Sequence, residues 1–361
     1  MAIDLFASYK IGKLDLKNRF VRSATWDAMA NEDGSVTEKS IELYTALGAG
    51  GMGLIISGHV FIDLPGKAGF GQYGIHDDTM IPGLKKMTAT ARKSGVRIAA
   101  QLAHSGLYCL GHDDPAIVVS VIPQVERPQH EMTDAEVVEL ISTYVSAARR
   151  AAEAGFDAIQ LHGAHGYLLS QFLSPLYNHR TDNWGGSAAR RRNFHLEVVK
   201  EIKKAVGSSY PVLIKLGVMD DKAGGLLLDE GVQAAVELAK AGIDAIEVSL
   251  GFGVAIRNTL NGEADTAYFR DLAATVKHKV NVPVMAVGGI RKLDTAKGII
   301  NCGEADMISM CRPFIREPDI ISKWQKDLTS RAECVSCGKC FGNAVKYSQL
   351  ACRNEAINTP K

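Results

Sequence analysis

Eight short apolar runs, each bounded by Gly, Pro or Asp, recur along the chain and constrain its fold more than any other feature. The stretches between them repeat apolar residues at helical spacing, as Val137, Ile141 and Tyr144 do within residues 134–154. Strands that alternate with helices form parallel sheets, and eight such units are typical of a (β/α)8 barrel of roughly 250 residues. The runs are FVRSAT from Phe20, GLIISG from Gly53, RIAAQL from Arg97, DAIQLH from Asp157, PVLIKL from Pro211, DAIEVS from Asp244, PVMAVG from Pro283 and ADMISM from Ala305. We therefore predict an α/β protein, a TIM barrel over residues 1–330, followed by a short cysteine-rich segment over residues 331–361.

A doubly wound dinucleotide fold is the main rival, because residues 48–53 read GAGGMG and match the G-x-G-x-x-G pattern. That pattern must follow a strand and open a helix to hold a pyrophosphate. Here the glycines end a helical stretch and lead into the run at Leu54. We interpret them as a helix end and a turn.

The length beyond a minimal barrel lies in two insertions, residues 105–132 and 167–187, and in the stretch after the eighth strand. The two insertions follow predicted strands, on the barrel face that carries chemistry in this fold. The 41 basic and 40 acidic residues give a net charge of +1, which offers no electrostatic reason to expect nucleic acid or a membrane surface as a partner. No apolar run reaches the roughly 18 residues that a membrane span needs, and the first ten residues do not resemble a secretory signal. We expect a cytoplasmic protein.

Polar residues follow the predicted strands, where a barrel would bring them together. Gly288 and Gly289 follow the seventh strand and Cys311 and Arg312 the eighth, the usual place for a phosphate held by backbone N–H groups. Lys215 ends the fifth run, where it could hold an anionic ring or act as a Schiff-base nucleophile. The other strand-end residues are Ser23, Thr25, Trp26, Ser57, Gly58, His59, Gln101, His104 and Ser249.

The sequence HGAHGY places His162, His165 and Tyr167 directly after the fourth strand. A metal would need a third ligand, and no Asp, Glu or Cys stands nearby at a suitable spacing. Two histidines that donate hydrogen bonds to a substrate oxygen, with a tyrosine as proton donor, account better for the motif.

Four cysteines lie close together near the end of the chain, Cys334, Cys337, Cys340 and Cys352. Four thiolates suit a [4Fe–4S] cluster or a structural zinc, and two successive C-x-x-C gaps favour the cluster. Zinc, or no metal, stays open. Because the cysteines follow the last strand, losing one of them is expected to spare whatever ligand the barrel strands bind.

These motifs resemble the old yellow enzyme family of flavin-dependent barrels, the NADH:flavin oxidoreductases, over essentially the whole chain. The stretches that carry the resemblance are LKNRFVRSAT, AAQLAHSG, HGAHGYLLSQFLSPLYNHRTDNWGGS, AVGGI and CRPFIREPD. The cysteine spacing is similar to that of the 2,4-dienoyl-CoA reductase and trimethylamine dehydrogenase branch. Members of that branch hold FMN in the barrel and a [4Fe–4S] cluster just behind it.

The resemblance implies a role for each motif residue. His162 and His165 would hold a substrate carbonyl, Tyr167 would donate the proton, and the four cysteines would hold the cluster. Gly288, Gly289, Cys311 and Arg312 would bind the FMN phosphate. The residues around the isoalloxazine ring would be Ser23, Ala24, Thr25, Trp26, Gly58, Gln101 and Lys215.

The leading functional hypothesis is an ene-reductase that receives electrons from NAD(P)H and passes a hydride from flavin N5 to an activated C=C bond of an enone or enoyl thioester. The cluster would relay single electrons, and a separate reductase or ferredoxin would be the electron partner. A flavin-dependent amine dehydrogenase or demethylase is one alternative, and a flavin-free Schiff-base lyase using Lys215 is another. The expected partners are a small-molecule substrate and the electron partner; a homo-oligomer stays open.

Overall fold

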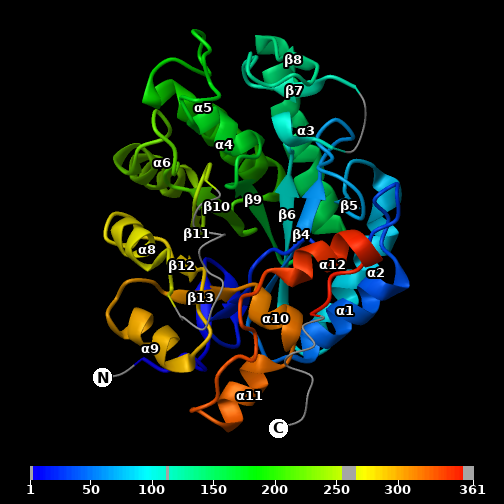
Figure 1. Ribbon diagram of the computed structural model, residues 1–361, viewed down its shortest axis with the longest axis vertical. Helices are drawn as coiled ribbons and strands as arrows, with labels where there is room; N and C mark the ends of the chain where they lie inside the picture. The colour runs from blue at the N-terminus through cyan, green and yellow to red at the C-terminus, as the bar shows by residue number, and fades with distance from the viewer. Residues whose placement is uncertain (1–2, 111–113, 254–265, 353–361) are drawn as a thin grey trace.

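Eight parallel strands form a closed barrel, and helices surround it (Figure 1). The computed structural model describes residues 3–110, 114–253 and 266–352. Around the barrel the order is β3-β4-β6-β9-β10-β11-β12-β13, and β13 pairs with β3 to close the ring. The strands are β3 (Phe20–Arg22), β4 (Leu54–Phe61), β6 (Arg97–Ala103), β9 (Ala158–Gly163), β10 (Val212–Gly217), β11 (Ala245–Ser249), β12 (Val284–Val287) and β13 (Met307–Met310). Each overlaps one of the eight predicted runs, so the TIM barrel prediction is confirmed.

The helices pack apolar faces on the outside of the strands. They are α1 (Glu38–Ala49), α2 (Ile81–Arg92), α3 (Asp134–Glu153), α4 (Leu168–Leu173), α5 (Ala188–Val206), α6 (Leu228–Ala241), α8 (Arg270–Lys277), α9 (Leu293–Asn301), α10 (Arg312–Arg316), α11 (Ile320–Lys326) and α12 (Lys339–Tyr347). Helix α3 begins where the sequence predicts, because Thr133 and Glu136 form a reciprocal capping box there. Helix α1 ends at Ala49, so residues 48–53 close a helix and lead into β4 as interpreted.

The lower part of the barrel interior is an apolar floor. Inward residues alternate along each strand, and the first inward set of the barrel is entirely apolar. An N-terminal hairpin of β1 (Tyr9–Ile11) and β2 (Leu14–Leu16), which the sequence analysis did not predict, adds Ile11, Leu14 and Leu16 to the same cluster. The barrel residues of this floor are Val21, Leu54, Ile56, Ala99, Ala158, Leu213, Ala245, Met285 and Met307. The hairpin therefore covers the end of the barrel opposite the predicted site.

The two predicted insertions fold onto each other beside the barrel mouth. The first contains a short helix (Gly106–Tyr108) and a two-stranded parallel sheet of β7 (Ala116–Val118) and β8 (Gln129–Glu131), and the second contains α4. Arg180 of the second insertion is buried and donates to the carbonyls of Val119 and Met132 in the first. Near the first barrel helices, β5 (Tyr73–Gly74) pairs with the end of β4, and a single helical turn (Asp78–Met80) precedes α2.

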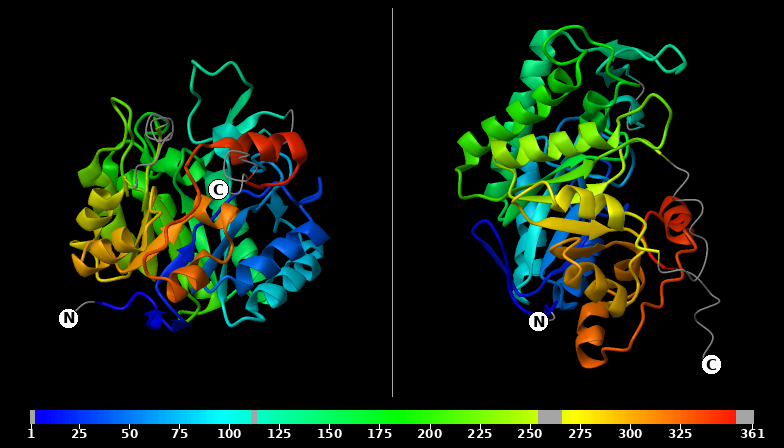
Figure 2. Two further views of the ribbon diagram at one scale, coloured as in Figure 1. Left: turned by 60° about the horizontal axis from the view of Figure 1, so that its bottom comes forward. Right: turned by 90° about the vertical axis from the view of Figure 1, so that its left-hand side faces the viewer.

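The described part of the C-terminal extension packs against the barrel. Figures 1 and 2 show α12 beside α10, outside the ring of strands. Ala344 and Leu350 pack with Ala28, and the Leu350 N–H donates to the Asp27 carbonyl at 2.8 Å. The division at residue 331 stays a prediction. Among the described residues, no helix is long and apolar enough to cross a membrane.

Candidate active site

His162, His165 and Tyr167 lie together at the carboxyl end of β9. The His162 ring centroid is 4.9 Å from that of Tyr167 and 5.3 Å from that of His165. His165 has a φ of +62°, which is unusual for a residue with a side chain. Its N–H donates to the Leu250 carbonyl at 2.9 Å, and its Nε2 lies 2.9 Å from Ser249 Oγ. These bonds to the end of β11 hold the turn in a conformation that the chain would otherwise disfavour.

His59, at the end of β4, joins this group. Its Nε2 lies 3.4 Å from the Tyr167 hydroxyl, and its ring centroid is 6.2 Å from that of His162. Burial lowers the pKa of His59 to about 4, so its ring is neutral near pH 7. The sequence identified His59 only as a strand-end polar residue. Its proximity to Tyr167 depends on the barrel, which sets β4 and β9 on either side of β6, and one run of sequence does not reveal that arrangement.

Below these side chains, the second inward layer of the barrel is polar and centred on Glu247. Its carboxylate accepts from Ser23 at 2.6 Å, Ser309 at 2.8 Å and Gln160 at 2.9 Å, and it lies 3.4 Å from Lys215 Nζ. Burial alone would raise the pKa of Glu247, but Lys215 and these hydrogen bonds outweigh it and hold the pKa below its usual value. Glu247 is therefore an anion inside the barrel. The sequence analysis did not single out Glu247, Gln160 or Ser309.

Lys215 and Gln101 belong to the same network. Lys215 Nζ donates to Ser23 Oγ at 2.9 Å, and Gln101 Nε2 donates to Gln160 Oε1 at 2.7 Å. A Schiff-base nucleophile needs a neutral amine, whereas the Lys215 ammonium is paired with a buried carboxylate. The pair argues against the lyase alternative. It fits the prediction that Lys215 and Gln101 present charge and hydrogen bonds to a ring bound above them.

The predicted ring-binding residues that follow β3 and β4 lie close to one another. Gly58 approaches the loop after β3 so closely that an added Cβ would lie 3.0 Å from the Thr25 carbonyl oxygen. Thr25 Oγ1 in turn lies 3.1 Å from Cys311 Sγ. Ala24 packs beside the apolar floor. Trp26 instead packs edge-on against Phe70, and its Nε1 donates to the Phe70 carbonyl at 3.2 Å. Trp26 thus contacts the loop after β4, and its ring also lies near Phe341 of α12.

The predicted phosphate residues line one cavity, which we call the phosphate cavity. Gly288 and Gly289 have φ values of +101° and +74°, and a Cβ on Gly288 would lie 2.5 Å from Tyr268. Only glycine fits there, and consecutive residues in such conformations can direct N–H groups at an anion. Its lining includes Gly288, Gly289, Arg291, Cys311, Arg312 and Ser336. This cradle suits the phosphate of FMN, and Arg291, which is buried, is the one basic lining residue that the sequence analysis missed.

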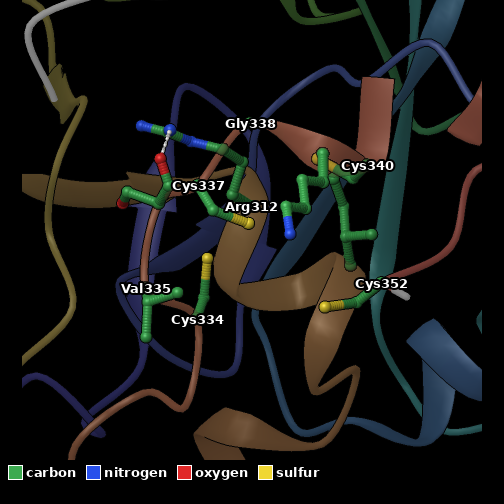
Figure 3. Close-up of a pocket in the computed structure, with 10 residues that line it drawn as sticks. Arg312, Cys334, Val335, Cys337, Gly338, Cys340 and Cys352 are labelled. Carbon is green, nitrogen blue, oxygen red and sulfur yellow. Dashed lines mark hydrogen bonds between the residues drawn. The ribbon is translucent and has the colours of Figure 1, made fainter. Parts of the chain in front are cut away.

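Cys334, Cys337, Cys340 and Cys352 line a second cavity, the cysteine cavity. Figure 3 shows Cys334 and Cys337 on one side of it and Cys340 and Cys352 on the other. Within the described ranges, no three or more His, Cys, Asp or Glu side chains are arranged as a metal site. Burial, together with smaller contributions from the nearby thiols of Cys311 and Cys334, raises the pKa of Cys340 to about 11. The donor set suits a thiolate-ligated metal, and binding would have to release protons from these thiols.

A TIM barrel with a glycine- and arginine-lined cavity after its last two strands, and a histidine–tyrosine group at its mouth, is typical of barrel enzymes that bind a phosphorylated cofactor. Residues 4–331 match the model of the NADH:flavin oxidoreductase / NADH oxidase family. The chain belongs to this family. The expected kinship with old yellow enzyme flavin oxidoreductases is thereby confirmed.

Individual relatives extend the comparison. The chain is 36% identical over 355 residues to an NADH oxidase of Thermoanaerobacter brockii, covering 95% of this chain and 54% of that protein. It is 32% identical over 376 residues to an N,N-dimethylglycine/sarcosine dehydrogenase of Chromohalobacter salexigens, covering 99% and 54%. A solved complex of 2-naphthoyl-CoA reductase superposes with a TM-score of 0.87 at 28% identity, covering 96% of this chain and 56% of that one. The chain thus spans about half the length of each of these three proteins.

Proposed function

We propose that this protein is an FMN-dependent ene-reductase that uses NAD(P)H to reduce an activated C=C bond of an enone or enoyl thioester. The observation that carries the proposal is the group of His162, His165 and Tyr167 above the polar layer. FMN, when bound, supplies the hydride. The family match supports the flavin, and the likeness to 2-naphthoyl-CoA reductase, named for a conjugated acyl thioester, supports the substrate class.

The residues at the barrel mouth would have two separate roles, binding the substrate carbonyl and donating a proton. His162 and His165 would donate hydrogen bonds to the substrate carbonyl, where negative charge develops as the hydride arrives at the β-carbon. Tyr167 would then protonate the α-carbon, and His59 lies within reach of its hydroxyl at 3.4 Å. Below them, Lys215 and Gln101 would hold the ring of the cofactor in place, with Glu247 holding Lys215.

The four cysteines would hold a [4Fe–4S] cluster. All four line one cavity, and thiolates are the usual ligands of such clusters. When bound, the cluster would relay single electrons between FMN and a separate reductase or ferredoxin. A structural zinc is the competing occupant of the same ligand set.

An amine dehydrogenase is the second candidate, favoured by the identity with N,N-dimethylglycine/sarcosine dehydrogenase over 99% of this chain. The two reactions run electrons in opposite directions through the flavin. An amine would reduce the oxidised enzyme, whereas an alkene would oxidise the reduced enzyme.

A two-part anaerobic experiment separates these functions. The oxidised protein is mixed with NADH, NADPH or N,N-dimethylglycine, and bleaching of the flavin absorbance is followed. The NAD(P)H-reduced protein is then mixed with 2-cyclohexenone or crotonyl-CoA, and the saturated product is identified by mass spectrometry. We expect reduction by a nicotinamide and reoxidation by an alkene. Reduction by the amine, with no reoxidation by either alkene, would refute the proposal in favour of the second candidate.

A further inference from the structure

The phosphate cavity and the cysteine cavity share a wall. Arg312 and Ser336 line both cavities. Arg312 Nη1 donates to the Ser336 carbonyl at 3.2 Å, which Figure 3 draws at the edge of the cysteine cavity. The side chain that should bind the FMN phosphate is therefore bonded to the backbone of the cysteine segment, residues 334–340.

Arg291, like Arg312, lines the phosphate cavity and is bonded to the backbone of the cysteine segment. It is only 1% exposed, lines the phosphate cavity, and donates from Nη1 to the Cys334 carbonyl at 3.0 Å. The backbone is tied in the same place, because the Ala332 N–H donates to the Arg291 carbonyl at 2.9 Å. A buried guanidinium carries five donors in a fixed fork, so it can bond a carbonyl with one edge and an anion with another.

We infer that Arg291 is a second phosphate-binding arginine for FMN, and that the cysteine segment positions both Arg291 and Arg312 through the carbonyls of Cys334 and Ser336. Flavin retention then depends on the order of a segment that lies outside the barrel. This reverses the expectation, drawn from chain position alone, that the cysteines contribute nothing to flavin binding. Anything that orders the segment, including a metal on its thiolates, should tighten FMN, and by linkage FMN should stabilise the segment.

The first test compares FMN with riboflavin, which has the same ring and ribityl chain but no phosphate. Dissociation constants of both are measured on the flavin-free full chain by fluorescence quenching. Arg291→Gln should weaken FMN binding about ten- to a hundredfold, the usual effect of losing a hydrogen bond to a charged group, and leave riboflavin unchanged. Arg316→Gln is the matched control, because Arg316 pairs with Glu333 at 3.0 Å and lines neither cavity. Equal losses for both flavins would overturn the role of Arg291.

The second test moves the segment without touching either arginine. Ser336 has a φ of +58°, where glycine is comfortable and a β-branched side chain is strained. Ser336→Val should displace the carbonyl that Arg312 binds and lower the ratio of FMN to riboflavin affinity about fivefold or more, whereas Ser336→Gly should keep it. Equal ratios in the two variants would overturn the coupling. Neither test uses an alkene or NAD(P)H, so failure of the proposed reaction leaves this result readable.

Discussion

Replacing Tyr167 with Phe isolates the proton-transfer step of the proposed reaction. The Phe variant keeps the ring, whose centroid lies 4.9 Å from that of His162 and 5.7 Å from that of His59. Tyr167 is also the N-cap residue of α4, but its side chain makes no hydrogen bond to the helix end. The substitution should therefore leave the fold intact and remove only the hydroxyl. Losing a general acid slows proton transfer about 10²–10⁴-fold. Tyr167 is partly exposed, so water can approach the α-carbon, and we expect the lower end, about 100-fold or about 2.7 kcal/mol.

Stopped-flow absorbance can follow each half-reaction of this variant separately. Reduction of the flavin by NAD(P)H needs no proton from Tyr167. Because the deleted hydroxyl takes no part in that half-reaction, its rate should stay within about twofold. Reoxidation by an alkene should show the 100-fold loss. Tyr177→Phe is the matched control, because it deletes a hydroxyl whose described partner is Tyr108 at 3.1 Å and not His59. Equal slowing of both half-reactions of Tyr167→Phe would refute the assignment.

Three further predictions concern the other parts of the site. His162→Ala and His165→Ala should each weaken the binding of phenols, titrated by flavin absorbance, by about 1.5–3 kcal/mol, the usual cost of losing a hydrogen bond to a charged oxygen, and should keep the FMN content. Loss of a metal with unchanged phenol affinity would instead show that the histidines are metal ligands. The purified chain should contain about four iron atoms and four sulfides, and Cys340→Ala should lose both in anaerobic elemental analysis. One zinc without sulfide would show that the four cysteines form a structural metal site and not an electron-transfer cluster. Glu247→Gln should lower the free energy of unfolding by about 3–5 kcal/mol in urea titrations, because Lys215 would remain buried without its counter-ion; an unchanged midpoint would contradict the ion pair's role.

The barrel strands could be predicted because each combines a Val- or Ile-rich run with Gly, Pro or Asp at its ends, signals that are local in sequence. The N-terminal hairpin was missed because its three-residue strands are too short to show a period. Cys337 and Cys340 could be grouped on spacing alone. Arg291 could not be assigned a role, because its partner at Cys334 lies 43 positions further along the chain.

The polar layer shows a subtler limit of sequence reasoning. Gln160 and Glu247 stand two positions after Ala158 and Ala245 of the floor, so the inward period of two was present in the sequence. What the sequence did not contain is the register that sets Lys215 beside Glu247 across β10 and β11. Without that pairing, Glu247 appears in the sequence only as a charged residue within an apolar run, with no counter-ion to explain it.

The buried Glu247–Lys215 pair makes better sense as positioning than as stabilisation. Removing two charges from water costs several kcal/mol for each ion, which their attraction rarely exceeds, so an apolar pair of similar size would suit the barrel's stability at least as well. The described contacts of the Lys215 ammonium use two of its three protons, at 2.9 Å to Ser23 and 3.4 Å to Glu247. Strand register places Lys215 opposite His162, which lies at the barrel mouth with His165 and Tyr167. The Lys215 ammonium is therefore held in place between the apolar floor and the residues at the barrel mouth, with one proton left to donate. A cofactor ring bound at that level would contact a fixed positive charge.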